Sequence, residues 1–132
     1  MYDAFIYRHQ DGFVLDCDRR VTGDFMFHLK QYKLRSKIEI MDESATMSIC
    51  AGWNGEAEDN AVKDERCDWN MWRTIVTSTD GVSRDTDIYN TLRMIKGVPE
   101  GPVEIARGKA IPMEYNLELM NGGTLGPHLS YI

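Results

Sequence analysis

The segment of residues 88–123 constrains the fold of this chain more than any other part. Its first part carries apolar residues at positions i, i+4 and i+7 of one helix face, namely Ile88, Leu92 and Ile95. Side-chain oxygens of residues 85–87 can cap the start of this helix, and Gly97 with Pro99 can end it. We therefore predict a helix over Asp85–Lys96, followed by an ordered loop and a second helical turn that stops at Gly122–Gly123.

The first part of the chain predicts a β-hairpin and a helix. Tyr2–Arg8 and Gly12–Cys17 have the composition of antiparallel strands joined by a turn at residues 10–12, where the Asp11–Gly12 dipeptide is typical of a hairpin. Asp18 can cap the next helix, which ends near Leu34. Its apolar stripe consists of Val21, Phe25, Leu29 and Tyr32.

The middle of the chain predicts three further strands. Charged and apolar residues alternate over Lys37–Met41, and Ala45–Ala51 and Trp72–Thr77 have strand composition. A turn is expected at residues 42–44, and the acidic block of residues 56–65 predicts a solvated loop or a frayed helix. These elements indicate an α+β fold, in which antiparallel sheet is flanked by helices.

Composition excludes two classes of partner. A chain of 132 residues with 42% hydrophobic content supports one domain with its own core. The net charge of −6 argues against a grip on nucleic-acid phosphates, which needs clustered Lys and Arg. The basic cluster Lys30, Lys33, Arg35 and Lys37 reads as the solvated end of a helix rather than as a binding patch. Since no apolar run is long enough for a membrane span, we expect neither nucleic acid nor membrane as a partner.

The cysteines do not predict a metal site. Cys17, Cys50 and Cys67 lie far apart, with no Cys-x-x-Cys pair and no histidine at ligand spacing. Cysteines in strand-like contexts are usually small buried hydrophobes. We therefore expect no metal bound by this chain.

A specific order of motifs runs along the chain. Its second half contains Tyr89-Asn90-x-x-Arg93, Gly97-Val98-Pro99-Glu100-Gly101, Pro112-x-Glu114-x-Asn116-Leu117 and Met120-Asn121-Gly122. Its first half contains Tyr2–Tyr7, Gly12–Asp18, His28-Leu29-x-x-Tyr32, Arg35-x-Lys37, Asp64-x-Arg66 and Arg73. On these motifs the chain resembles the folate-binding family that includes the bacterial protein YgfZ and mitochondrial iron–sulfur cluster assembly factors. This family is a branch of the glycine-cleavage aminomethyltransferase superfamily.

The resemblance implies a domain organisation. In the family, two folate-binding subdomains of antiparallel sheets and helices pack together. Residues 1–36 would be the end of the first subdomain, residues 37–122 the second, and residues 123–132 a divergent tail. This tail lacks the family's Lys-Gly-Cys-x-x-Gly-Gln-Glu signature and its C-terminal β-barrel. We therefore expect a truncated family member with impaired activity.

The resemblance also implies a site for tetrahydrofolate. A carboxylate suits the pterin ring because it can accept two parallel hydrogen bonds from the N–H edge of the ring. Glu114 matches a pocket glutamate, Asp3 matches a pocket aspartate, and Arg93 matches an arginine of the family's helix. Without the resemblance, Glu114 would cap a turn, Asp3 would be an exposed strand residue, and Arg93 would form a structural salt bridge to Glu100 or Glu104. Tyr89 and Asn116 match positions that we interpret as maintaining the fold.

By this resemblance we expect a folate-binding iron–sulfur cluster assembly factor of the mitochondrial matrix. It would mature four-iron cluster proteins together with scaffold proteins and client enzymes. Cys17 and Asp18 stand where aminomethyltransferases carry an Asn-Ala-Gly turn, which favours an assembly factor over an enzyme. The alternatives are a folate-dependent aminomethyl or one-carbon transferase, and a non-functional fragment that keeps only packing or partner contacts.

Overall fold

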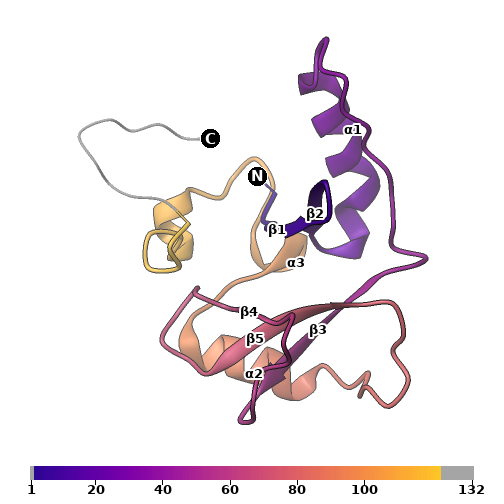
Figure 1. Cartoon of the computed structure of the whole chain (residues 1–132). Helices are drawn as coiled ribbons and strands as arrows, with labels where there is room; N and C mark the ends of the chain where they lie inside the picture. The colour runs from indigo at the N-terminus through magenta and orange to yellow at the C-terminus, as the bar shows by residue number, and fades with distance from the viewer. Residues whose placement is uncertain (1, 123–132) are drawn as a thin grey trace. The chain divides into compact units, whose positions relative to one another are not determined.

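The computed structural model describes residues 2–122, so the predicted divergent tail at 123–132 lies outside the described residues. The predicted α+β class with antiparallel sheets is confirmed (Figure 1). In chain order the elements are β1 (Phe5–His9), β2 (Gly12–Asp16), the 3-10 helix η1 (Arg19–Val21), α1 (Thr22–Tyr32), β3 (Ser48–Trp53), β4 (Val62–Lys63), β5 (Met71–Val76), α2 (Asp87–Lys96), α3 (Gly101–Glu104) and the 3-10 helix η2 (Pro112–Tyr115). Across the described residues, none of the helices combines the length and apolar character needed to cross a membrane.

The chain divides into two compact units. The first consists of the residues up to Thr46 together with Glu100–Lys109, and the second of Met47–Pro99 together with the residues from Ala110 on. The first unit therefore holds β1, β2, η1, α1 and α3, while the second holds β3, β4, β5, α2 and η2.

The predicted hairpin is confirmed in the first unit, and its turn lies within the predicted residues 10–12. β1 and β2 pair antiparallel, and His9 opposes Gly12 at the closed end. The loop therefore consists of Gln10 and Asp11, and Gly12 is already the first residue of β2. Gln10 takes the positive φ of 47° that the turn requires. Tyr7, on the inner face of β1, is buried.

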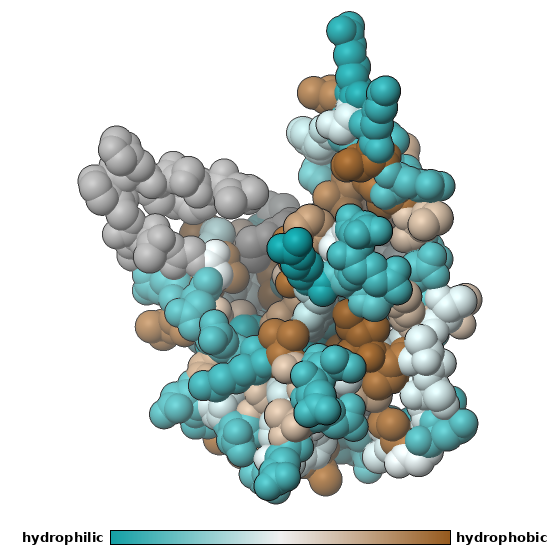
Figure 2. Space-filling view, in the orientation of Figure 1, coloured by the Kyte–Doolittle hydropathy of each residue, from teal (hydrophilic) through white to brown (hydrophobic). Residues whose placement is uncertain are grey.

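The first helical segment begins as predicted. The Oδ1 atom of Asp18 accepts a hydrogen bond of 2.8 Å from the backbone N–H of Arg20, which caps η1. The helix α1 ends at Tyr32, close to the predicted end. Much of its apolar surface is exposed, since Phe27 has 65% and Tyr32 71% of its surface accessible. Figure 2 shows brown apolar side chains among teal ones along this helix.

The predicted strand at Lys37–Met41 is wrong. Residues 36–43 have no regular secondary structure, and neither sheet of the described chain contains them. The alternation of charged and apolar residues is not sufficient for a strand, because a strand also needs a partner for its backbone hydrogen bonds. A turn does follow, at Ser44–Thr46, and Asp42 Oδ1 accepts the Ser44 N–H at 2.9 Å.

The second unit is built on a three-stranded antiparallel sheet in the order β3-β5-β4. The central strand β5 lies within one residue of the prediction, whereas β3 begins at Ser48, three residues later than predicted. In this register Gly52 opposes Trp72, and Val62 opposes Arg73. Strand β4 has only two residues and was not predicted from the sequence.

The predicted helix of the second unit is confirmed as α2. Asp85 Oδ1 accepts the Asp87 N–H at 2.9 Å at its start. At its end Gly97 adopts a left-handed φ of 66°, and the N–H of Val98 donates to the Arg93 carbonyl at 2.9 Å. This is the glycine-terminated helix end that the sequence predicts. The helix α2 contacts the sheet through Tyr89, which lies beside Arg73 of β5.

Charged side chains contribute a large share of the buried interior. Among residues 2–122, the buried apolar residues are Tyr7, Met71, Val98 and Ile105, and the buried polar ones are Asp64, Arg66, Arg73, Thr74 and Arg93. All five polar residues belong to the second unit. Buried charge is costly unless it is paired, so these side chains mark a candidate functional site.

Candidate functional site

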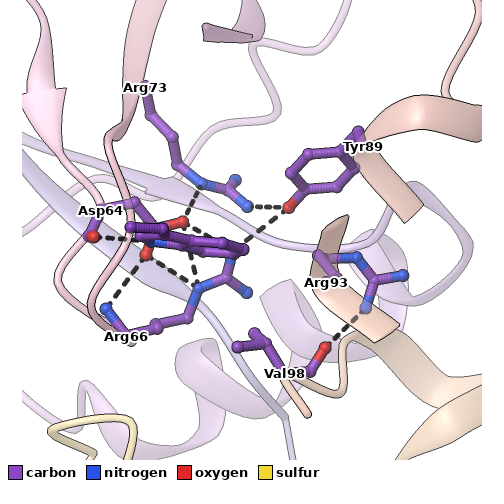
Figure 3. Close-up of polar contacts among 7 residues, drawn as sticks. Asp64, Arg66, Arg73, Tyr89, Arg93 and Val98 are labelled. Atoms are coloured by element: carbon purple, nitrogen blue, oxygen red, sulfur yellow. Dashed lines mark hydrogen bonds and ion pairs between the residues drawn. The ribbon is translucent and has the colours of Figure 1, made fainter. Parts of the chain in front are cut away.

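Four of these buried polar residues and the half-buried Tyr89 contact one another in the second unit, and we call the five residues the arginine cluster: Asp64, Arg66, Arg73, Tyr89 and Arg93 (Figure 3). Asp64 and Arg66 follow β4, Arg73 lies on β5, and Tyr89 and Arg93 lie on α2. Asp64 corrects the prediction that the whole acidic block is solvated, since only 1% of its surface is exposed. It is buried because two arginines surround its carboxylate.

Arg66 binds the Asp64 carboxylate with a forked guanidinium. Its Nε donates to Oδ1 at 3.0 Å and its Nη2 donates to Oδ2 at 2.7 Å, while its backbone N–H also donates to Oδ1 at 3.1 Å. Arg73 adds an ion pair from its Nε to Oδ2 at 3.5 Å. Such paired bonds orient both partners as well as neutralising charge.

These contacts determine the protonation of Asp64. Burial acts to raise the pKa of this carboxyl, but the hydrogen bonds from Arg66 and the charges of Arg66 and Arg73 outweigh burial. The pKa of Asp64 is therefore lower than the usual value for an aspartic acid. The carboxylate stays ionised at neutral pH and remains a counter-charge for the arginines.

Tyr89 joins the helix to the sheet through the same arginines. Its hydroxyl oxygen accepts hydrogen bonds from Nη2 of Arg66, at 3.2 Å, and from Nη2 of Arg73. The guanidinium carbons of Arg73 and Arg93 lie 5.7 Å and 5.4 Å from the centre of its ring, within cation–π range. These contacts agree with the interpretation of Tyr89 as a residue that maintains the fold.

Arg93, one of the three predicted folate contacts, is 4% exposed. Its Nη1 donates to the Val98 carbonyl at 2.9 Å and its Nη2 donates to Asn90 Oδ1 at 3.0 Å. The bond to Val98 holds the end of α2 against the turn that follows it, and the bond to Asn90 lies within the helix. The structure therefore gives Arg93 a part in the local fold, and its contact with a ligand stays a prediction.

Glu114 and Asp3, the other two predicted contacts, lie in different surroundings. Glu114 is exposed on η2, where its backbone N–H donates to the Ile111 carbonyl at 2.9 Å. Asp3 is half-buried in the first unit, and its Oδ2 accepts the backbone N–H of Gly101 at 2.9 Å. Arg93 and Glu114 thus share the second unit, one buried and one exposed, and Asp3 belongs to the first.

All three cysteines are half-buried: Cys17 in the first unit, and Cys50 and Cys67 in the second. Burial raises the pKa of Cys17, Cys50 and Cys67 above the ordinary thiol value, and a protonated thiol is a weak nucleophile and a weak metal ligand. Within residues 2–122 no three His, Cys, Asp or Glu side chains are grouped so that they could hold a metal ion.

Comparison with known proteins gives relatives from one family. The chain is 30% identical to "Iron-sulfur cluster assembly factor IBA57 homolog, mitochondrial" of Dictyostelium discoideum, over 85% of its own length. It is 29% and 30% identical to "Iron-sulfur cluster assembly factor IBA57, mitochondrial" of Homo sapiens and Mus musculus, over 92% of its length in both cases.

The chain spans 34% of the length of the Dictyostelium relative and 41% of the human and mouse relatives. No model of a known protein family matches the chain. No solved structure matches it either. The resemblance that the motifs predict is nevertheless confirmed at the level of sequence: over nearly its whole length, this chain is similar to the mitochondrial iron–sulfur cluster assembly factors.

Proposed function

We propose that this chain takes part in iron–sulfur cluster assembly in the mitochondrial matrix, as the corresponding part of an assembly factor. The observation that carries the proposal is its similarity to three mitochondrial assembly factors over 85% to 92% of its length. We propose scaffold proteins and client enzymes as its partners, and four-iron clusters as the cargo delivered to these clients.

A replacement experiment in cells tests this function. In cells that lack their own assembly factor, the matching segment of the human relative is exchanged for this chain, and the activity of a four-iron enzyme is measured. We expect the chimera to restore much of this activity, because the exchanged segment keeps the family's motifs. A two-iron enzyme in the same cells serves as the control for general loss of mitochondria. A chimera that is expressed at the normal level but restores no four-iron activity would contradict the proposal.

We further propose the fold of the superfamily's folate-binding domain, with residues 1–36 and 37–122 in its first and second subdomains. The antiparallel sheets flanked by helices support this assignment.

Tetrahydrofolate is the ligand that we propose, with Asp3, Glu114 and Arg93 as its contacts. The exposed carboxylate of Glu114 fits the role, because a ligand can reach it. Asp3 also fits, since its half-buried carboxylate is already oriented by one backbone N–H. Arg93 fits in part: its Nη1 and Nη2 donate to the chain, so it would act mainly by holding the turn after α2.

The substitution Glu114→Gln tests the ligand. It removes the charge-assisted pair of hydrogen bonds to the pterin, and we expect tetrahydrofolate affinity, measured by calorimetry, to fall by about tenfold or more. Glu118→Gln is the matched control, because Glu118 is also exposed and follows the same helical turn. Equal affinity of the two variants, or an absence of binding by the unaltered chain, would refute the assignment.

A further inference from the structure

We propose that Gly101 is a positioning residue for Asp3, and that it acts through its backbone N–H and through the absence of a side chain. The inference deepens the proposed function and rests on it, since it concerns one of the three proposed folate contacts. It uses only contacts within the first unit.

The first step is the hydrogen bond between the two residues. The N–H of Gly101 donates to Oδ2 of Asp3 at 2.9 Å, and the two residues are 98 positions apart in the chain. Gly101 is buried and begins α3. A bond to a buried backbone amide restricts the rotamers of the aspartate, so its carboxylate loses less freedom when it binds a ligand.

The second step is the conformation of Gly101. Its φ is 76°, in the left-handed region that glycine adopts without cost. A Cβ atom at this position would lie 2.7 Å from Oδ2 of Asp18 and 3.5 Å from Nη2 of Arg20. Any side chain at position 101 would therefore collide with the Asp18 carboxylate.

The third step is that Arg20 restrains the Asp18 side chain. Its Oδ1 accepts hydrogen bonds from Nε and from the backbone N–H of Arg20, at 2.9 Å and 2.8 Å, and its Oδ2 pairs with Nη2 of Arg20 at 2.5 Å. The hydrogen bonds from Arg20 oppose a rotation of Asp18 away from residue 101, so the collision is shared between a strained Asp18–Arg20 pair and a shift of the backbone of residue 101. Its N–H would then leave Asp3, which would lose its fixed orientation.

The experiment compares two glycines of the first unit. Gly108 has a similar φ of 71°, but a Cβ there would meet no atom within 4 Å. Gly101→Ala and Gly108→Ala therefore introduce the same backbone strain, and only Gly101→Ala introduces the collision. We expect Gly101→Ala to weaken tetrahydrofolate binding by about tenfold, and Gly108→Ala to bind like the unaltered chain. Asp3→Ala should cause a loss like that of Gly101→Ala, and the double variant should lose no more.

A rescue and a direct probe distinguish positioning from general damage. Asp18→Ser shortens the side chain and still caps η1, so Asp18→Ser combined with Gly101→Ala should recover binding. In the chain with an intact Gly101, the amide proton of Gly101 should shift upfield in the NMR spectrum of Asp3→Ala. This measurement needs no ligand, and it does not depend on whether the Gly101→Ala variant folds, because Gly101 is intact in the chain that is measured.

The outcomes separate the two proposals. An unaltered chain that does not bind tetrahydrofolate overturns the ligand, and the positioning role with it. Binding by the unaltered chain that Gly101→Ala leaves intact overturns the positioning role alone. An unchanged chemical shift of the Gly101 amide proton in Asp3→Ala would likewise overturn the positioning role.

Discussion

Replacing Asp64 by Asn is expected to destabilise the second unit by about 3–5 kcal/mol, because it leaves buried arginines without their counter-charge. The Asp64 carboxylate receives Nη2 of Arg66 at 2.7 Å and Nε of Arg73 at 3.5 Å, and both arginines are less than 10% exposed. Asparagine keeps the size of the side chain but carries no charge. A typical domain is stable by about 5–15 kcal/mol, so this loss brings the unit close to unfolding.

Urea unfolding followed by tryptophan fluorescence measures this effect. Trp69 is a suitable probe, because its Nε1 donates to the Asp64 backbone carbonyl at 2.8 Å. Asp59→Asn is the matched control: Asp59 is exposed in the same acidic block, and its replacement should change stability by less than about 0.5 kcal/mol. Similar midpoints for the two variants would show that the arginine cluster does not stabilise the unit.

The same carboxylate makes stability depend on pH. The pKa of Asp64 is lower in the folded chain than the value of about 3.9 expected when the chain is unfolded. The ionised carboxylate therefore makes its full contribution to the free energy of unfolding when the pH is above the unfolded pKa. This contribution is lost as the pH falls through the lower pKa of the folded chain. The stability difference between the unaltered chain and Asp64→Asn should accordingly be full at neutral pH and shrink in strong acid. A difference that stays constant down to low pH would contradict this account.

Replacing Gly52 by Ala is expected to destabilise the sheet of the second unit by about 1–3 kcal/mol through overpacking. Gly52 of β3 opposes Trp72 of β5, and the indole ring lies across the glycine. A Cβ at position 52 would be 2.6 Å from Cε2 and 2.9 Å from Cζ2 of that ring. Such distances are too short for carbon atoms, so the indole or the strand must move.

A double-mutant cycle in urea tests the cause. Trp72→Leu removes the indole. In that background, Gly52→Ala should lower the free energy of unfolding much less than it does beside the tryptophan. Gly55→Ala is the control, since a Cβ there would make an ordinary contact of 3.8 Å with Cη2 of Trp72. If Gly52→Ala costs the same with and without the indole, the effect comes from another source.

Local features were predictable because their causes lie within a few residues. Asp85 accepts the N–H of the first residue of α2, and Gly97 ends the helix; both signals stand next to the helix in the sequence. The capping role of Asp18 depends on Arg20, only two positions away. The hairpin is predictable for the same reason, since its turn at Gln10 and Asp11 lies directly between the two strands.

The errors concern features whose causes lie far along the chain. Residues 37–41 alternate like a strand, but neither sheet offers them a pairing position among the described residues. Asp64 looks like part of a solvated acidic block, but it is buried, and its ion pair with Arg73 comes from the distant strand β5. The Asp64-x-Arg66 spacing was a usable signal, since such a pair can form a forked bond within one turn.

The features of the candidate site also fall into those that the sequence predicts and those that it does not. The resemblance to assembly factors follows from the order of motifs, and comparison with known proteins confirms it. Motifs also nominated Asp3, Glu114 and Arg93, but they could not say that Arg93 is buried and Glu114 exposed. They also gave no reason to connect Asp3 with Gly101.

Family resemblance and the short-range elements were thus readable from the residues alone, because motifs, caps and periodicity are properties of neighbours in the chain. Which charges are buried, and which glycines tolerate no side chain, depended on the folded arrangement. The energy of a buried charge is set by the groups within a few ångströms of it, and strand pairing and helix packing bring these groups together from distant positions.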